Sequence, residues 1–371
     1  MKQTNSYKQK IFFYLSAVIF LSLIISCGGF SKLSNSNIPV DIYVGGNSGG
    51  KYSDDRVAVY WKNGEMIPLE TKRSNVLSIA VAGNDVYMGG YYIDGYTIQA
   101  DGYNGIPRAC YWKNGKRVSL SNAKYGSSVY DIFVSGNDVY VCGWISNRED
   151  EISSGYWKNG KWVGLVKAKD GSWLVSIFVS GDNVYACGRS KNSDVKWRPA
   201  YWKNGEWIEL PSLNEKKDAF ANSIFIAGND VYLGGHSYNN SGINIACYWK
   251  NGKLIALPSL SENKDASVCS IFMLGNDVYF GGYSYDNSGI SIACYWKNDK
   301  IIPLLLSESK WSSVNSIFVF GRDIYAVGLI QGSDGFDIPG YWKNGDWVKL
   351  DAKGYYPSAS SIVVVPRPTV Q

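Results

Sequence analysis

The tetrapeptide Tyr-Trp-Lys-Asn occurs seven times, and no other feature of the 371-residue chain constrains its fold as strongly. The copies begin at Tyr60, Tyr111, Tyr156, Tyr201, Tyr248, Tyr295 and Tyr341, so they are 45 to 51 residues apart. A period near 45 residues is typical of propellers and solenoids, in which neighbouring repeats share one core. The chain is therefore expected to form one repeat array, although its length alone would suggest two or three domains.

Each repeat contains four short apolar segments that we interpret as strands. The first resembles Ser-Ile-Phe-Val at 176–179, and the second follows the form Gly-Asn-Asp-Val-Tyr-x-x-Gly, as at 228–235. The third is Tyr-Trp-Lys, and the fourth ends in Leu, as at 207–210. Gly-Asn-Asp joins the first two strands, and Asn-Gly joins the last two, except at 298–299, where Asp replaces Gly. Asn-Gly strongly predicts a tight hairpin because both residues tolerate positive φ.

The chain ends predict a closed ring. The first motif, at 41–46, is a second strand with no first strand before it, and the last motif, at 361–365, is a first strand with no successor. The C-terminal strand would therefore complete the first repeat and cover its inner edge. We predict an all-β, seven-bladed β-propeller over residues 39–366, with four antiparallel strands per blade, followed by a short tail at 367–371.

The N-terminus has the pattern of a targeting segment. Lys2, Lys8 and Lys10 precede an apolar stretch at 11–25, which is short for a membrane span. The following Ile24-Ile25-Ser26-Cys27 resembles the lipobox of bacterial lipoproteins, and this resemblance implies lipidation of Cys27. Residues 1–26 would then be a signal peptide and 27–38 a lipidated Cys with a flexible tether. The expected location is the cell envelope, on the outer membrane or the cell surface.

The repeat also resembles the Kelch repeat. The resemblance rests on a second strand ending in Tyr-x-x-Gly and on a Tyr followed by a Trp, and it spans residues 41–365. The Tyr-Trp pairs are Tyr156 with Trp162, Tyr201 with Trp207, and Tyr341 with Trp347. The Tyr-to-Trp gap is one residue shorter than is usual in Kelch, and four repeats lack the second Trp. The resemblance implies a propeller, but not galactose oxidase chemistry, whose copper ligands do not map onto this chain.

The regularly repeated residues are interpreted as packing groups. Seven Trp and fourteen Tyr recur at fixed positions, and a binding site rarely needs seven equal copies. The Lys after each Trp is expected at the rim or over an aromatic ring, with a phosphate-binding ring as the alternative. Six cysteines after Cys27 replace small or apolar residues and are expected to fill the core. No metal-type spacing is present, and we expect neither a metal nor another cofactor.

Candidate binding residues lie on the face formed by the longer, varied loops. These loops join the second strand to the third and each blade to the next, and we call this side the variable face. The residue directly after the second-strand Gly differs in every blade except two, and it forms a ring on that face. The expected ligand contacts are Asn47, Tyr91, Trp144, Arg189, His236 and Tyr283, with Trp197, Arg198, Tyr238 and Tyr285 nearby; Leu329 completes the ring. Such side chains suit a glycan or protein ligand, or they only support the loops.

Two functions remain open. The favoured one is a non-catalytic binding or scaffold propeller, anchored to a membrane by its lipid and monomeric. The alternative is a glycan hydrolase or lyase that uses carboxylates such as Asp131, Asp286 or Asp337, since His236 is the only histidine. Removal of residues 1–26 takes away three lysines and no acids, which lowers the net charge from +5 to +2. This near-neutral chain gives no electrostatic argument for nucleic-acid binding.

Overall fold

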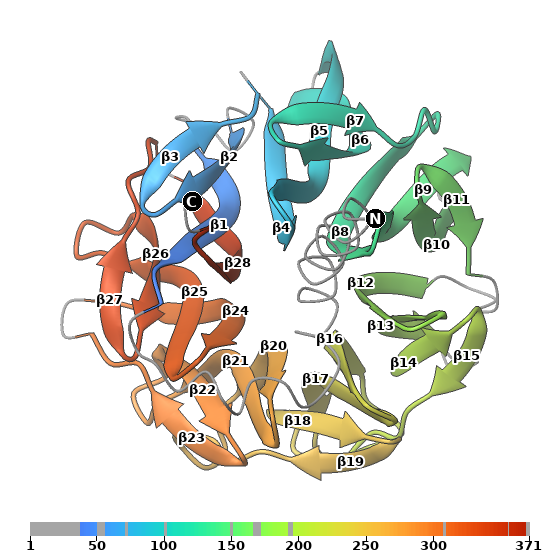
Figure 1. Cartoon of the computed structure of the whole chain (residues 1–371). Helices are drawn as coiled ribbons and strands as arrows, with labels where there is room; N and C mark the ends of the chain where they lie inside the picture. The colour runs from blue at the N-terminus through green and yellow to red at the C-terminus, as the bar shows by residue number, and fades with distance from the viewer. Residues whose placement is uncertain are drawn as a thin grey trace, which may run out of the picture.

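A computed structural model of the chain describes residues 38–49, 56–70, 73–99, 102–148, 151–165, 172–191, 196–306, 309–354 and 356–368. These residues form seven four-stranded antiparallel sheets, arranged as blades around a common axis (Figure 1). The predicted lipidation site, signal peptide and almost all of the tether lie outside the described residues. Within the described part of the chain, there is no helix with the length and apolar character needed to cross a membrane.

The strands of blades 1 to 4 follow chain order, except that the last strand of the chain belongs to blade 1. Blade 1 contains β1 (Val40–Ser48), β2 (Val57–Lys62), β3 (Glu65–Pro68) and β28 (Ser358–Pro366), and blade 2 contains β4 (Ser74–Ala82), β5 (Asp85–Gln99), β6 (Gly102–Lys113) and β7 (Lys116–Ser119). Blade 3 contains β8 (Gly126–Ser135), β9 (Asp138–Arg148), β10 (Glu151–Lys158) and β11 (Lys161–Gly164), and blade 4 contains β12 (Ser172–Ser180), β13 (Asn183–Lys191), β14 (Trp197–Lys203) and β15 (Glu206–Glu209).

Blades 5 to 7 repeat the same order. Blade 5 contains β16 (Ala219–Ala227), β17 (Asp230–Tyr238), β18 (Asn244–Lys250) and β19 (Lys253–Ala256), and blade 6 contains β20 (Ala266–Leu274), β21 (Asp277–Tyr285), β22 (Ser291–Lys297) and β23 (Lys300–Pro303). Blade 7 contains β24 (Ser312–Phe320), β25 (Asp323–Gln331), β26 (Asp337–Lys343) and β27 (Asp346–Lys349).

The predicted closure is confirmed. The first blade has the strand order β28-β1-β2-β3, so its innermost strand comes from the C-terminus. β28 pairs antiparallel with β1 in the register Val44 opposite Ile362. Arg367 extends the closure, because its guanidinium lies 2.9 Å from a carboxylate oxygen of Asp41. The two ends of the propeller are thus joined by a ladder of hydrogen bonds, which leaves no open inner edge on blade 1.

The repeated Lys and Asn residues serve the turns on the face opposite the variable face. In blade 3, Asn159 and Gly160 both have positive φ, of 50° and 79°, as a tight hairpin requires. The Asn159 side chain donates a hydrogen bond to Asp138 and accepts one from the Val139 amide. Lys158 lies 3.0 Å from Asp138 and 5.1 Å from the ring centroid of Tyr140. This arrangement confirms the cation–π interpretation of the repeated lysines.

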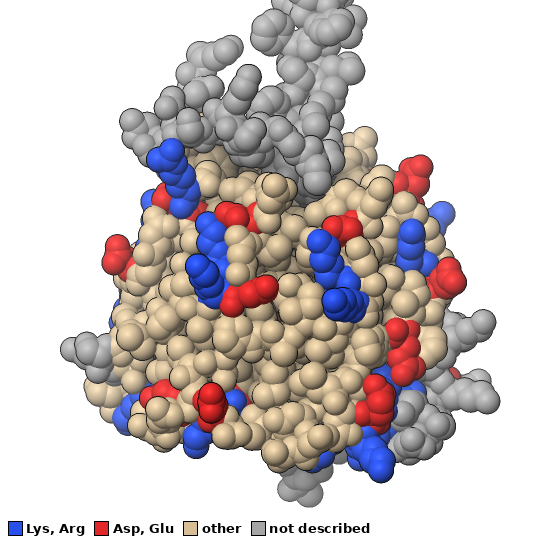
Figure 2. Space-filling view, turned by 90° about the horizontal axis from the view of Figure 1, so that it is seen from below, with Lys and Arg blue, Asp and Glu red and all other residues tan. Residues whose placement is uncertain are grey.

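The seven repeated Trp residues form the packing between blades. Each is at most 1% exposed, and each belongs to a cluster of buried apolar side chains. The six described cysteines are free thiols, and all except Cys269 are fully buried, which confirms their role as core fillers. Charged side chains of both signs lie near both rims of the outer wall visible in Figure 2, and the middle of that wall is largely uncharged.

Candidate functional site

The predicted ring follows a glycine that the backbone geometry requires. In blade 5, a Cβ on Gly235 would lie 1.9 Å from the carbonyl oxygen of Phe220, and the equivalent glycines of other blades show the same close approach. The next residue, His236, pairs with Phe220 on the innermost strand. The equivalent pairs are Trp173 with Arg189 and Ser267 with Tyr283. Each ring residue therefore lies beside one residue of the innermost strand, at the variable end of its blade.

Two of the predicted contact residues lie in the interior. Asn47 is 1% exposed, and its amide nitrogen donates hydrogen bonds to Asn75 and Ser358. Arg198 is 3% exposed and forms an ion pair of 3.1 Å with Glu215. Its guanidinium also donates to the Ser212 hydroxyl and to backbone carbonyls of the loop between blades 4 and 5. Asn47 therefore links the innermost strands of blades 1 and 2, and Arg198 holds the loop between blades 4 and 5 in place.

Arg189 lies at the centre of a cluster of aromatic rings. The carbon atom of its guanidinium is 4.5 Å from the ring centroid of Phe220, 4.8 Å from that of Trp197 and 5.9 Å from that of Trp173. Trp197 comes from β14, Trp173 from β12 and Phe220 from β16, so blades 4 and 5 both contribute. All four side chains are partly exposed.

The cluster continues in both directions around the ring. On one side, Trp173 lies 6.4 Å from Trp144 of blade 3, measured between ring centroids. On the other side, Phe220 lies 4.8 Å from the His236 ring, which in turn meets Tyr238 edge-on at 6.1 Å. We call this set the aromatic arc; it comprises Trp144, Trp173, Arg189, Trp197, Phe220, His236 and Tyr238. Tyr91 is half-buried in blade 2, where it pairs with Asn75, and belongs to neither this arc nor the pocket described next.

Burial sets the protonation state of His236. Desolvation, with a contribution from the nearby positive charge of Arg189, lowers the pKa of the imidazole from 6.5 to about 4. Its Nδ1 atom lies 2.9 Å from the Ser267 hydroxyl oxygen in blade 6. The imidazole is therefore neutral at pH 7 and contributes an apolar ring surface and a hydrogen-bonding group rather than a charge.

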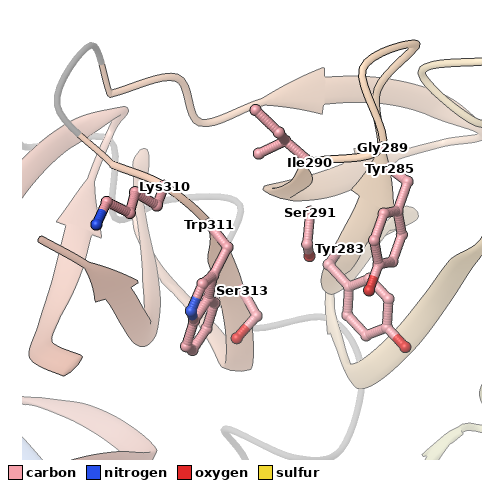
Figure 3. Close-up of a pocket in the computed structure, with 8 residues that line it drawn as sticks. All are labelled: Tyr283, Tyr285, Gly289, Ile290, Ser291, Lys310, Trp311 and Ser313. Atoms are coloured by element: carbon pink, nitrogen blue, oxygen red, sulfur yellow. The ribbon is translucent and has the colours of Figure 1, made fainter. Parts of the chain in front are cut away.

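An open pocket of about 510 Å³ lies between blades 6 and 7, and we call it the blade 6–7 pocket. Its lining residues are Tyr283, Tyr285, Gly289, Ile290, Ser291, Lys310, Trp311 and Ser313. In Figure 3, Trp311 stands on one side of the pocket and the two tyrosines on the other. The tyrosine rings meet nearly edge-on, with centroids 6.0 Å apart. Burial raises the pKa of Tyr283 to about 12, so its hydroxyl is protonated and can donate a hydrogen bond at pH 7.

Sequence reasoning identified Tyr283 and Tyr285 but missed Trp311, Trp173 and Phe220. A signal for the last two was present. They occupy the innermost-strand position at which the other blades have Ser or Asn: Ser358, Asn75, Ser128, Ser267 and Ser313. Two aromatic exceptions at a small polar position indicate a local specialisation of blades 4 and 5. Trp311 lies in a loop between blades, where the repeat provides no reference residue for comparison.

The carboxylates considered for catalysis have different surroundings. Asp131 accepts hydrogen bonds from the Ser78 and Ser176 hydroxyls and from the amides of Ile132 and Ile177, and it thereby links blades 2, 3 and 4. Asp286 accepts a hydrogen bond from the Ile290 amide within its own loop. Asp337 is half-buried at the start of β26, and burial raises its pKa. Among the described residues, no group of three or more His, Cys, Asp or Glu side chains is placed to hold a metal ion.

Comparison with known proteins supports the fold. No protein-family model matches the chain, and no curated protein matches it. Among solved structures, the β-propeller domain of the Trilobed protease from Pyrococcus furiosus, described as having an open velcro topology, is similar with a TM-score of 0.51 at 13% identity. That comparison covers 84% of this chain and 94% of the other. SapL1 lectin in complex with alpha methyl fucoside gives a TM-score of 0.47 at 13% identity, over 76% of this chain and 96% of the lectin.

Proposed function

We propose that this protein is a non-catalytic saccharide-binding propeller that presents its variable face to a glycan. The observation that carries the proposal is the blade 6–7 pocket, which combines Trp311, Tyr283 and Tyr285 with serine hydroxyls and one lysine. A pocket of about 510 Å³ falls within the size range of small-molecule sites, roughly 300–1,000 Å³.

The chemistry of the pocket suits a sugar ring. A pyranose has an apolar face of C–H groups and an edge of hydroxyls, so it is well matched by an aromatic ring with polar groups beside it. Trp311 supplies the aromatic surface, and the protonated Tyr283 supplies a hydroxyl that can donate or accept. The Ser291 and Ser313 hydroxyls line the same space and can bond to sugar hydroxyls. Lys310 is exposed at the rim and can donate hydrogen bonds.

The aromatic arc extends this surface toward blades 3 to 5. His236 contacts Ser267, and Ser267 pairs with Tyr283 on the neighbouring strand, so the arc and the pocket adjoin each other at blade 6. A chain of several sugar units would therefore contact both. A non-catalytic role is favoured because hydrogen bonds within the fold account for Asp131 and Asp286, two of the three carboxylates considered for hydrolysis.

The test is a glycan panel screened with the wild-type protein and with Trp311→Ala. Loss of one aromatic binding anchor is expected to weaken affinity by roughly thirtyfold or more, since such anchors contribute about 2 kcal/mol. The matched control is Tyr356→Ala, because Tyr356 is an aromatic residue that is 50% exposed in a loop before β28, outside the pocket. Equal binding by wild type and Trp311→Ala, or the release of shortened glycan products, would overturn the proposal.

The same proposal places the propeller on a membrane through a lipid on Cys27, as the lipobox resemblance implies. Wild-type protein should partition into detergent, and mass spectrometry should find an acyl chain on Cys27 of a mature chain that lacks residues 1–26. Cys27→Ala should abolish both. A wild-type protein that stays in the aqueous phase and carries no acyl chain would remove the anchor from the proposal without affecting the saccharide site.

A further inference from the structure

We infer that Arg189 and Lys191 form an anion subsite within the aromatic arc, and that the saccharide carries a carboxylate group. This inference rests on the proposed function and specifies its ligand as an acidic glycan. It starts from a guanidinium that lies among three aromatic rings and forms no ion pair with a carboxylate of the described residues.

Three other arginines of the propeller show what such an ion pair looks like. Arg108, Arg117 and Arg198 form ion pairs with Asp94, Glu70 and Glu215, at distances of 3.3, 2.8 and 3.1 Å. No carboxylate of the described residues forms an ion pair with Arg189. Asp218, whose negative charge favours the charged form of Arg189, forms no ion pair with it and accepts a hydrogen bond of 2.9 Å from the Trp197 amide, which fixes the start of β14.

Partial burial makes this lack of a partner costly. Desolvation lowers the pKa of Arg189, although the guanidinium remains charged at any ordinary pH. A charge removed from water without a counter-ion destabilises the fold, and buried charges are normally paired. The aromatic rings compensate in part, because a cation over a ring face is attracted to it. They offer no hydrogen-bond acceptor for the N–H groups along the edge of the guanidinium.

A second cation lies on the same ring. The Lys191 ammonium is 5.1 Å from the Trp197 centroid, and the Arg189 guanidinium is 4.8 Å from it. Both residues belong to the end of β13, two positions apart, so they point to the same side of the strand. Two positive charges therefore meet at one tryptophan, and the Arg189 charge also contributes to the lowered pKa of His236. This local field favours a negatively charged ligand group.

A carboxylate on a sugar ring fits these features together. The fork of guanidinium N–H groups matches the two oxygens of a carboxylate. The pyranose ring that bears the carboxylate has an apolar face that can rest on Trp197 or Trp173. A uronic or sialic acid unit at this point would leave the next sugar units to follow the arc past His236 toward the blade 6–7 pocket.

The experiment compares acidic glycans with their own neutral forms. A panel of uronate- and sialate-containing oligosaccharides is presented beside the carboxyl methyl ester of each, which keeps the sugar ring and removes the charge. Wild-type protein should bind acids at least about tenfold more tightly than esters, consistent with roughly 1.5–3 kcal/mol for a hydrogen bond to a charged group. This preference should shrink as salt is raised.

The variants are Arg189→Gln, Arg189→Lys and Lys191→Gln, each checked for folding by its melting curve. Arg189→Gln should remove the preference for acids over their esters. Arg189→Lys should retain part of it, because the charge remains but the fork is lost. Lys191→Gln should weaken the preference for acids less than Arg189→Gln does. Lys191 supplies a positive charge near Trp197 but lacks the guanidinium fork that matches a carboxylate.

The failure of this inference can be told apart from the failure of the proposed function. If acids and esters bind equally and Trp311→Ala weakens both, the protein binds saccharides and the anion subsite is wrong. If Arg189→Gln removes acid binding while Trp311→Ala has no effect, the anion subsite stands and the blade 6–7 pocket is not the saccharide site. If neither acids nor esters bind, the anion subsite is wrong, and if no neutral glycan of the panel binds either, the proposed function is wrong as well.

Discussion

The Nδ1 atom of His236 in blade 5 lies 2.9 Å from the hydroxyl oxygen of Ser267 in blade 6, so the chain's single histidine joins two blades. The centroid of its ring lies 4.8 Å from that of Phe220, with the two rings tilted by 34°. The positive charge of Arg189 is close enough to oppose protonation of the imidazole. Burial is the largest cause of the lowered pKa, the Arg189 charge acts in the same direction, and the Asp265 carboxylate opposes both. The net effect is a neutral imidazole, whose protonation is unfavourable in the folded state.

The first prediction is therefore a destabilisation of the protein by mild acid through His236. Its pKa is about 4 when folded and near 6.5 when unfolded, so between these values the unfolded chain binds a proton that the folded chain does not. The free energy of unfolding should fall as pH drops through this window, by at most about 1.4 kcal/mol per pH unit from this group. NMR titration of the imidazole, on protein without a histidine tag, measures the folded pKa directly. His236→Gln should show a flatter stability profile from pH 6.5 to 5, and an imidazole that titrates near 6.5 would contradict the prediction.

The second prediction separates two arginines of blade 4 by their effect on stability. Arg198→Leu should destabilise the protein by about 1–3 kcal/mol, because it leaves backbone carbonyls of the loop between blades 4 and 5 without their donor. Arg189→Leu should change the free energy of unfolding by no more than about 1 kcal/mol, because the lost cation–π contacts are offset by removal of a partly buried charge that has no ion-pair partner among the described residues. Chemical denaturation of both variants measures the difference. A large loss for Arg189→Leu would mean that this residue serves the fold rather than a ligand.

The third prediction concerns Asp131, which occupies a position held by Ser in the six other blades. In three of those blades the serine hydroxyl accepts a hydrogen bond from an isoleucine amide of the next blade, as Ser223 does from Ile271 at 3.2 Å. Asp131→Ser should therefore stay within about 1 kcal/mol of wild type, since the new hydroxyl can accept from Ile177. Asp131→Ala should cost about 1–3 kcal/mol, because it leaves that amide unpaired. Equal stability of the Ser and Ala variants would show that the hydrogen bonds of Asp131 contribute little.

The fourth prediction tests closure of the ring. Ending the chain after Pro357 removes β28 and exposes the paired edge of β1, so the protein should aggregate or lose its cooperative melting transition. Ending it after Arg367 keeps both β28 and the contact with Asp41, and should leave the melting temperature unchanged. A milder variant, Ile362→Ala, removes a side chain that is 4% exposed and should cost about 2–4 kcal/mol. A truncation after Pro357 that melts like wild type would show that closure is dispensable.

The fold could be predicted from the sequence because the turn residues, the strand patterns and the aromatic spacing of every repeat all indicate the same architecture. Asn-Gly specifies a hairpin by its tolerance of positive φ, and the fixed spacing of Trp and Tyr places the same side chains between every pair of blades. The unmatched strands at 41–46 and 361–365 were sufficient to predict which blade the chain ends share. The position after the second-strand glycine was also correctly recognised as the place where the blades differ.

The sequence by itself determined the number of blades, their four strands, the closure by the C-terminus and the face on which the blades vary. The tertiary structure alone decided which variable residues meet. It buried the side chains of Asn47 and Arg198, brought Trp173 and Phe220 against Arg189, and placed Trp311 opposite Tyr283. The physical reason is that the contacts that pack one blade against the next are the same throughout the ring, so the residues that make them recur in every copy of the motif. A site between blades instead depends on contacts among residues that occur once and lie in different repeats, and no periodicity links them.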